Sequence, residues 1–159
     1  MSRPRPHAKR SVQSVQPIDE LIRELAQFRY ALRKFLRFSE NAARKCGVTP
    51  QQHQLMLGVA GFTGRRSATV SELAEFLQER PHSVVGLIER AAQHGLVRRM
   101  QDETDRRVVN VSVTASGNLL LSRLTRLHEE EARRIQDLLG TRGAASDERP
   151  FWNGNEYRK

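Results

Sequence analysis

The sequence lacks the features that mark membrane and secreted proteins. Its 159 residues contain no apolar run near the length of about 20 residues that a spanning helix needs. The basic start is followed by polar residues, so we expect no signal peptide. The one cysteine, Cys46, cannot form an internal disulfide. Together these absences favour a cytoplasmic protein.

The chain also lacks the patterns on which catalysis and metal binding depend. We find no paired carboxylates, no nucleophile beside a base and no glycine-rich phosphate loop. The residues that could ligate a metal are scattered and do not have the spacing of a ligand set; they are Cys46, His53, His82, His94 and His128. We therefore expect neither an enzyme nor a cofactor or metal site.

Positive charge is what the sequence has in excess. The net charge is +9, and 28% of the residues are charged. Residues 1–16 hold basic side chains without an acidic one, and we expect them to form a disordered arm. A basic surface favours polyanions. Because no membrane segment is present, the charge points to double-stranded DNA as the partner.

Helical periodicity organises most of the chain. Apolar residues recur at steps of three and four over 17–46 and again over 115–139, which predicts two long amphipathic helices. Capping-box patterns at Thr49 and Thr69 predict the starts of two shorter helices. Residues 141–159 lack the periodicity, and we expect them to form a loose C-terminal tail.

Residues 69–114 are the most informative segment. They begin with a short helix, and Pro81 suits the first turn of a second one. Alternating apolar residues over 96–100 and 107–113 then predict two strands. This order is that of a winged helix-turn-helix, which would cover about 48–113. The expected fold is mainly α, with a small β-hairpin wing.

The second short helix carries side chains suited to reading DNA. Arg80 can make a forked contact to guanine, and Val85 can contact a thymine methyl group. Asp105 is expected to orient a wing arginine through an ion pair. The first short helix begins where free backbone N–H groups attract phosphate. The candidate DNA-binding residues are Thr69, Ser71, Arg80, His82, Ser83, Val85, Gly86, Arg90, Arg98, Arg99, Arg106 and Arg107.

Several motifs resemble the MarR family of bacterial transcriptional regulators. The matching stretches are LAEFL at 73–77, SVVGLIERAAQHGLVRR at 83–99, DETDRR at 102–107 and VSVTASG at 111–117. With VTPQQ at 48–52, the resemblance spans roughly residues 17–140. Gln78 stands where many members have glycine, and Arg80-Pro81 where many have serine. Base preference therefore cannot be carried over from the family.

The resemblance implies a homodimer whose first and last long helices interlock. Two recognition helices would then contact successive major grooves of a near-palindromic operator. It also implies repression, with release by a small ligand. The residues expected between the subunits are Ile18, Leu21, Ile22, Leu25, Leu120, Leu124, Leu127, Ile135 and Leu138. The candidate effector pocket is lined by Phe28, Leu32, Phe35 and Phe62.

Two other functions stay open at this point. A winged helix can serve as a protein-interaction module that never meets DNA. Cys46 could instead act as a thiol sensor, although its place on the apolar stripe of the first long helix favours a buried and inert side chain.

Overall fold

Five helices and three short strands make up the described part of the chain. The computed structural model describes residues 18–62, 64–101 and 108–138, with side chains up to residue 135. The elements are α1 (Ile18–Lys45), α2 (Pro50–Ala60), β1 (Ser67–Thr69), α3 (Val70–Leu77), α4 (Pro81–Gln93), β2 (Val97–Gln101), β3 (Val109–Val113) and α5 (Ala115–Leu138). The predicted N-terminal arm, wing tip and C-terminal tail lie outside the described residues.

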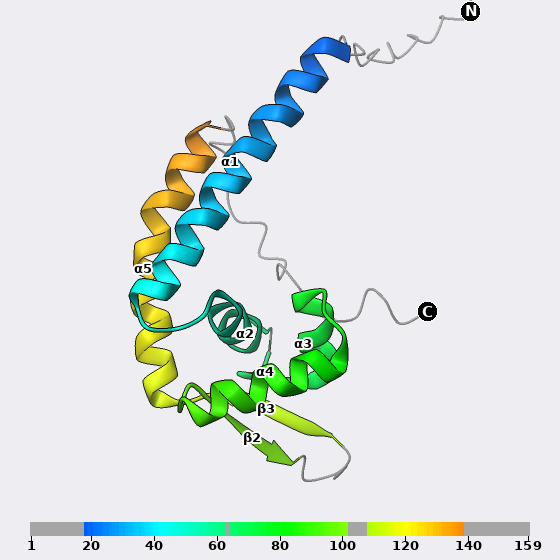
Figure 1. Ribbon diagram of the computed structural model, residues 1–159, viewed down its shortest axis with the longest axis vertical. Helices are drawn as coiled ribbons and strands as arrows, with labels where there is room; N and C mark the ends of the chain where they lie inside the picture. The colour runs from blue at the N-terminus through cyan, green and yellow to red at the C-terminus, as the bar shows by residue number, and fades with distance from the viewer. Residues whose placement is uncertain (1–17, 63, 102–107, 139–159) are drawn as a thin grey trace, which may run out of the picture.

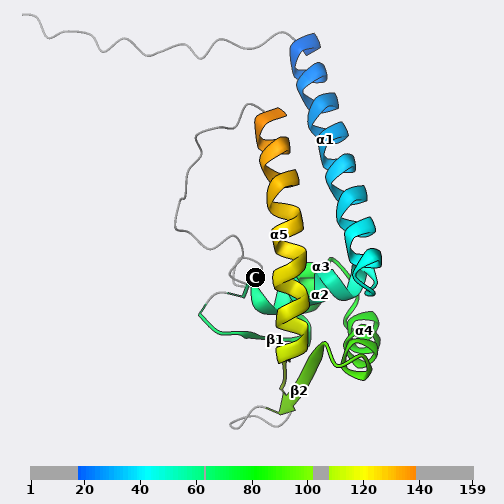
Figure 2. The ribbon, with the colours of Figure 1, turned by 90° about the vertical axis from the view of Figure 1, so that its left-hand side faces the viewer.

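The two long helices, α1 and α5, lie side by side and rise from the part that holds α2, α3, α4 and the strands (Figures 1 and 2). The first turns of α1 project beyond the end of α5 in both views. None of the helices in the described residues is long and apolar enough to cross a membrane. The predicted mainly α fold with a small β-sheet is confirmed.

Capping boxes begin the helices that the sequence predicted. The Thr49 hydroxyl accepts from the backbone N–H of Gln52 at 3.1 Å, and the Gln52 side chain accepts from Thr49 N–H at 3.0 Å. Thr69 and Glu72 make the same reciprocal pair at the start of α3. Each box satisfies two backbone donors that a helix N-terminus leaves without an intrahelical partner.

The junction between the sheet and α5 depends on Gly117. The Thr114 hydroxyl caps α5 by accepting from Gly117 N–H at 3.0 Å. A Cβ atom on Gly117 would lie 2.2 Å from the Leu96 carbonyl oxygen and 2.7 Å from Val113 Cγ1. Any larger residue would therefore force α5 away from the start of β2.

The strands form a three-stranded antiparallel sheet in the order β1-β3-β2. The sequence predicted only the two strands of the hairpin, β2 and β3. The structure corrects this, because β1 pairs with β3 through Ser67 opposite Ser112 and Thr69 opposite Asn110. A strand of three residues is too short to show a reliable alternation of apolar and polar side chains.

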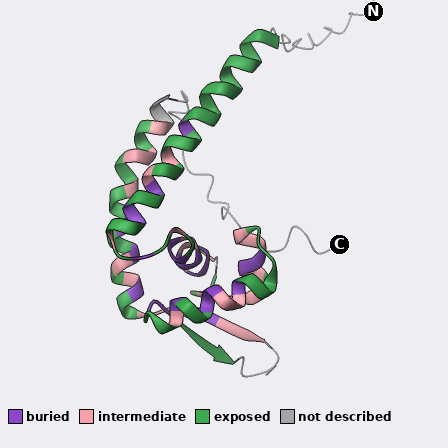
Figure 3. Cartoon of the chain, in the orientation of Figure 1, coloured by how far each residue is buried: buried purple, intermediate pink, exposed green. Residues whose placement is uncertain are grey.

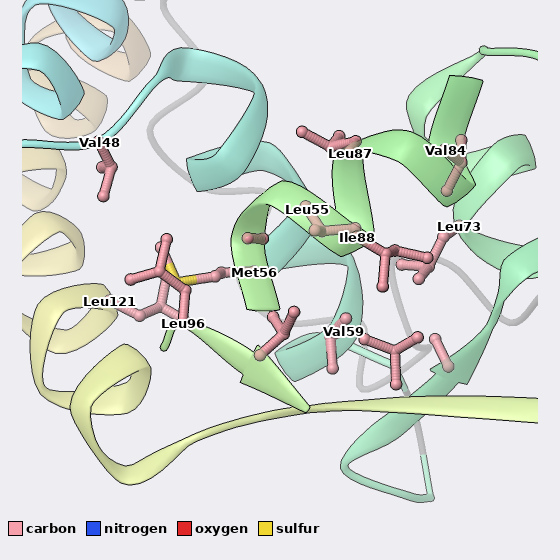
Figure 4. Packing of buried hydrophobic residues seen from close by; sticks show 14 of the residues in the cluster. Val48, Leu55, Met56, Val59, Leu73, Val84, Leu87, Ile88, Leu96 and Leu121 are labelled. Atoms are coloured by element: carbon pink, nitrogen blue, oxygen red, sulfur yellow. The ribbon is translucent and has the colours of Figure 1, made fainter. Parts of the chain in front are cut away.

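The core fills the space between α2, α3, α4, the sheet and the base of α5. Its largest fully buried side chains include Leu55 and Met56 of α2, Leu73 of α3 and Ile88 of α4, and Figure 4 shows their packing. Leu124 of α5 is also fully buried here. It was expected between subunits, but its side chain belongs to the core of its own chain. By contrast, the N-terminal half of α1 is exposed (Figure 3).

Candidate nucleic-acid interface

Helix α4 has one buried face and one exposed polar face. Its buried side chains are Val84, Leu87, Ile88 and Ala91, as the helical spacing predicted. Arg80, His82 and Ser83 are exposed at its N-terminal end. The packing therefore fixes the orientation of α4 and leaves the predicted base-reading side chains in solvent.

Gln78 and Arg80 lie in the turn between α3 and α4. Arg80 is the N-cap residue of α4, but its side chain makes no cap hydrogen bond. Helix α3 ends at Leu77, and its C-cap residue Gln78 has a φ of 54°, which lies in the left-handed region that favours glycine. The Gln78 side chain steadies this turn by donating to the Glu75 carbonyl at 2.7 Å. This hydrogen bond within the turn stabilises Gln78 in a conformation that glycine usually adopts.

Gly86 and Arg90 shape the middle of the exposed face. A Cβ atom on Gly86 would lie 3.4 Å from the Arg90 guanidinium, so this side chain folds back over the glycine. Gly86 and Val85 are half-buried, whereas Arg90 is exposed. The Arg90 side chain therefore covers the part of this face where Gly86 has no side chain.

The start of α3 is less open to phosphate than the sequence suggested. The Thr69 hydroxyl caps the helix, and the Glu72 carboxylate accepts from Thr69 N–H at 2.7 Å. The same carboxylate is ion-paired with Arg65, whose guanidinium lies 4.6 Å from the centre of the Phe62 ring. Ser71 is exposed. A phosphate at this helix end would meet a carboxylate, which opposes the expected role of Thr69.

Arg98 and Arg99 point to opposite faces of the sheet, because successive strand residues alternate. Arg98 pairs across the sheet with Ser112 and donates to its hydroxyl at 2.9 Å. Arg99 lies on the face toward α4, where its guanidinium forms an ion pair with the Glu89 carboxylate at 3.5 Å. The two guanidinium groups therefore cannot contact the same stretch of DNA backbone together. Arg106, Arg107 and Asp105 lie outside the described residues.

A cavity of about 750 Å³ lies between α1, α2, α3 and α5. We call it the histidine cavity, and its wall includes Phe35, His53, Leu57, Glu75, Phe76 and His128. Of the four residues expected to line an effector pocket, Phe35 does so. Phe28 and Leu32 are exposed on α1, and Phe62 packs against the core. Residues of α2, α3 and α5 supply the remaining wall, because α1 covers only one side.

Two histidines in this cavity were not expected to meet. The centres of the His53 and His128 rings lie 5.0 Å apart, and the Phe35 and Phe38 rings contact His128 edge-on. The His128 Nδ1 atom lies 2.6 Å from the Leu124 carbonyl, so Nδ1 carries the proton and donates. His128 Nε2 and His53 Nδ1 are buried and have no hydrogen-bond partner in the described residues. Sequence spacing alone gives no signal for this pair, which comes from different helices.

Burial first, and the electrostatic interaction with His128 second, together lower the pKa of His53 from 6.5 to about 4. The His53 ring is therefore an uncharged imidazole at neutral pH. In the described residues, no group of three or more histidine, cysteine or acidic side chains could hold a metal ion.

The residues predicted to contact a second subunit lie on α1 and on α5. Ile18, Leu21, Ile22 and Leu25 are between 42% and 68% exposed on α1. On α5, Leu127 is exposed, Leu120 and Ile135 are half-buried, and the side chain of Leu138 is not described. The first turns of α1 thus present a continuous apolar face that nothing in the described chain covers. Cys46 is half-buried at the end of the same helix.

Comparison with known proteins identifies this arrangement. The family model for the MarR family matches residues 47–108, which span α2 to the wing. This segment of the chain matches the MarR family. This confirms the resemblance seen in the sequence motifs.

Individual proteins are similar to this chain in sequence or in fold. The HTH-type transcriptional repressor MdtR of Bacillus subtilis (strain 168) is 35% identical over 75 residues, which cover 47% of this chain and 46% of MdtR. The chain therefore matches about half the length of that curated relative. The YusO protein of Bacillus subtilis is 26% identical with a TM-score of 0.56, over 77% of this chain and 85% of YusO.

The fold is also that of a mutant MarR from E.coli solved in a complex with operator DNA. The TM-score is 0.58 at 19% identity, over 80% of this chain and 93% of that one. At this identity the likeness concerns the fold.

Proposed function

We propose that this protein is a sequence-specific DNA-binding transcriptional regulator. The observation that carries the proposal is the exposed face of α4, which presents Arg80, His82 and Ser83 to solvent while its opposite face is anchored in the core. Arginine and small polar side chains on a rigid helix suit the base edges of a major groove. The net charge of +9 favours the same partner.

We further propose that the regulator acts as a homodimer and represses a near-palindromic operator. The exposed apolar face at Ile18, Leu21, Ile22 and Leu25 supports a dimer, because large exposed apolar patches mark contact surfaces. A second copy of this chain would cover these residues and place a second α4 for a neighbouring major groove. The similar protein MdtR is named a transcriptional repressor, which supports repression as the action of this chain.

The histidine cavity supports release by a small ligand. Its wall includes Glu75, Phe76 and Gln78, and Gln78 belongs to the turn that leads to Arg80. A ligand that moves the end of α3 would therefore shift the start of α4. Volumes of about 300–1,000 Å³ are typical of sites for drug-sized molecules, and the cavity falls within this range.

Selection of bound duplexes from a random pool tests the DNA proposal. The expected outcome is a near-palindromic motif whose half-sites lie about 10 bp apart, bound less tightly as salt rises. A protein-interaction module would return no motif and no binding at moderate salt, and either result would refute sequence-specific recognition. A thiol sensor would lose DNA affinity on peroxide treatment in the wild type but not in Cys46→Ser. Loss in both proteins, or in neither, would exclude Cys46 as the sensor.

A further inference from the structure

The histidine cavity has an unusual balance of polar groups, which restricts what can enter it. Its apolar wall includes Phe35, Leu57 and Phe76. The polar groups include two buried imidazole nitrogens, His53 Nδ1 and His128 Nε2, that have no partner in the described residues. His53 itself is 2% exposed. A buried polar atom without a hydrogen bond raises the free energy of the protein, so a ligand that supplies the missing hydrogen bond gains affinity.

These imidazoles favour a ligand that donates hydrogen bonds. His128 Nδ1 already donates to the Leu124 carbonyl at 2.6 Å, which leaves Nε2 with a lone pair. This nitrogen can therefore accept an N–H or O–H bond, but it cannot donate one to a carboxylate. The edge-on contacts of Phe35 and Phe38 hold the ring in this orientation.

The charged residues around the cavity are acidic. Glu75 lines it, and an adjoining hollow of about 360 Å³ shares Ser39 and Gln54 and adds Glu40 and Glu79. Within the described part of the chain, neither wall includes a lysine or an arginine. Glu75 forms no ion pair with any described residue. An organic anion would meet repulsion here, whereas a cation would find a counter-charge.

We propose that the histidine cavity binds a largely apolar organic cation, such as an aromatic amine in its protonated form. The ammonium group pairs with the Glu75 carboxylate and donates an N–H bond to His128 Nε2, while the apolar part packs on Phe35 and Phe76. This assignment rests on the proposed ligand-responsive regulator and specifies the chemistry of its effector.

A matched set of probes tests the assignment by calorimetric titration of the full chain without DNA. The probes are 1-naphthylmethylamine, its neutral alcohol analogue and 1-naphthoate, which share a ring system and differ in charge. The amine is expected to bind most tightly, the alcohol more weakly and the carboxylate not at all. Equal or tighter binding of the carboxylate, or no binding of the amine, would overturn the proposal.

Variants locate the binding within the cavity. Glu75→Gln should weaken the amine about tenfold and leave the alcohol unchanged, because only the amine loses an ionic partner. His128→Phe should weaken both about fivefold, and His128→Gln should restore part of the loss through its side-chain oxygen. Glu130→Gln, at an exposed position on α5, is the matched control. Unchanged amine affinity in both cavity variants, with melting temperatures near that of the wild type, would place the site elsewhere.

DNA binding is measured separately, so the two proposals can fail independently. A protein that binds its operator but none of the amine would refute the cation assignment and leave DNA recognition standing. A protein that binds the amine in the cavity but keeps its operator would support the assignment and refute ligand release.

Discussion

Acidification should destabilise this protein through His53, and replacing that residue should remove the effect. The pKa of His53 is lowered from 6.5 to about 4, first by burial and then by the electrostatic interaction with His128. The unfolded chain therefore binds this proton more readily than the folded chain. The stabilising difference is complete above pH 6.5 and is lost as the pH falls from 6.5 toward 4.

The size of the effect follows from the difference between the two pKa values. A depression from 6.5 to about 4 corresponds to about 3 kcal/mol in total, since one pKa unit is worth 1.36 kcal/mol. About 2 kcal/mol of this should be lost between pH 7.5 and pH 5. That loss is a large fraction of the 5–15 kcal/mol by which proteins are usually stable.

Urea unfolding of the wild type and of His53→Gln at several pH values measures the effect. The variant keeps a polar side chain but does not titrate, so its unfolding free energy should fall about 2 kcal/mol less over the same pH range. His82→Gln is the control, because His82 is exposed on α4. Parallel curves for the wild type and His53→Gln would refute the assignment of the acid sensitivity to His53.

The remaining predictions concern packing, the turn before α4 and the dimer. Gly117→Ala should lower the unfolding free energy by about 2 kcal/mol or more, because its Cβ atom would collide with the Leu96 carbonyl; unchanged urea unfolding would contradict that contact. Gln78→Gly should raise it by about 0.5 kcal/mol, because relief at a positive φ slightly exceeds the entropic cost of glycine; a clear loss would show that the side-chain hydrogen bond dominates. The double substitution Leu21→Glu and Leu25→Glu should convert the proposed dimer into monomers in sedimentation experiments. A dimer that persists in this variant would disprove the role of the exposed apolar face of α1 in dimerisation.

Local signals in the sequence predicted the helices well. Thr49 with Gln52, and Thr69 with Glu72, mark helix starts through contacts between residues three apart, and both capping boxes are present. The buried face of α4 follows equally from its helical period. Such features depend on neighbours along the chain, so they can be read without knowing the fold.

Features that depend on distant residues could not be predicted. The pairing of β1 with β3, the contact of Arg99 with Glu89 and the meeting of His53 with His128 each join separate elements. The periodicity of α5 showed that Leu124 lies on an apolar face, but not whether its own chain or a partner covers that face. Only the packing of α5 on the core resolves this.

The affinity of the purified protein for the duplex upstream of its own gene tests the central claim most directly. Arg80→Ala should weaken binding to that duplex by about 1–3 kcal/mol and relax its sequence preference, because the Arg80 side chain is exposed at the start of α4 and makes no cap hydrogen bond. Arg123→Ala, which removes the same charge from an exposed position on α5, should leave the preference unchanged. Equal affinities for the wild type and Arg80→Ala, on this duplex and on unrelated DNA, would contradict the account.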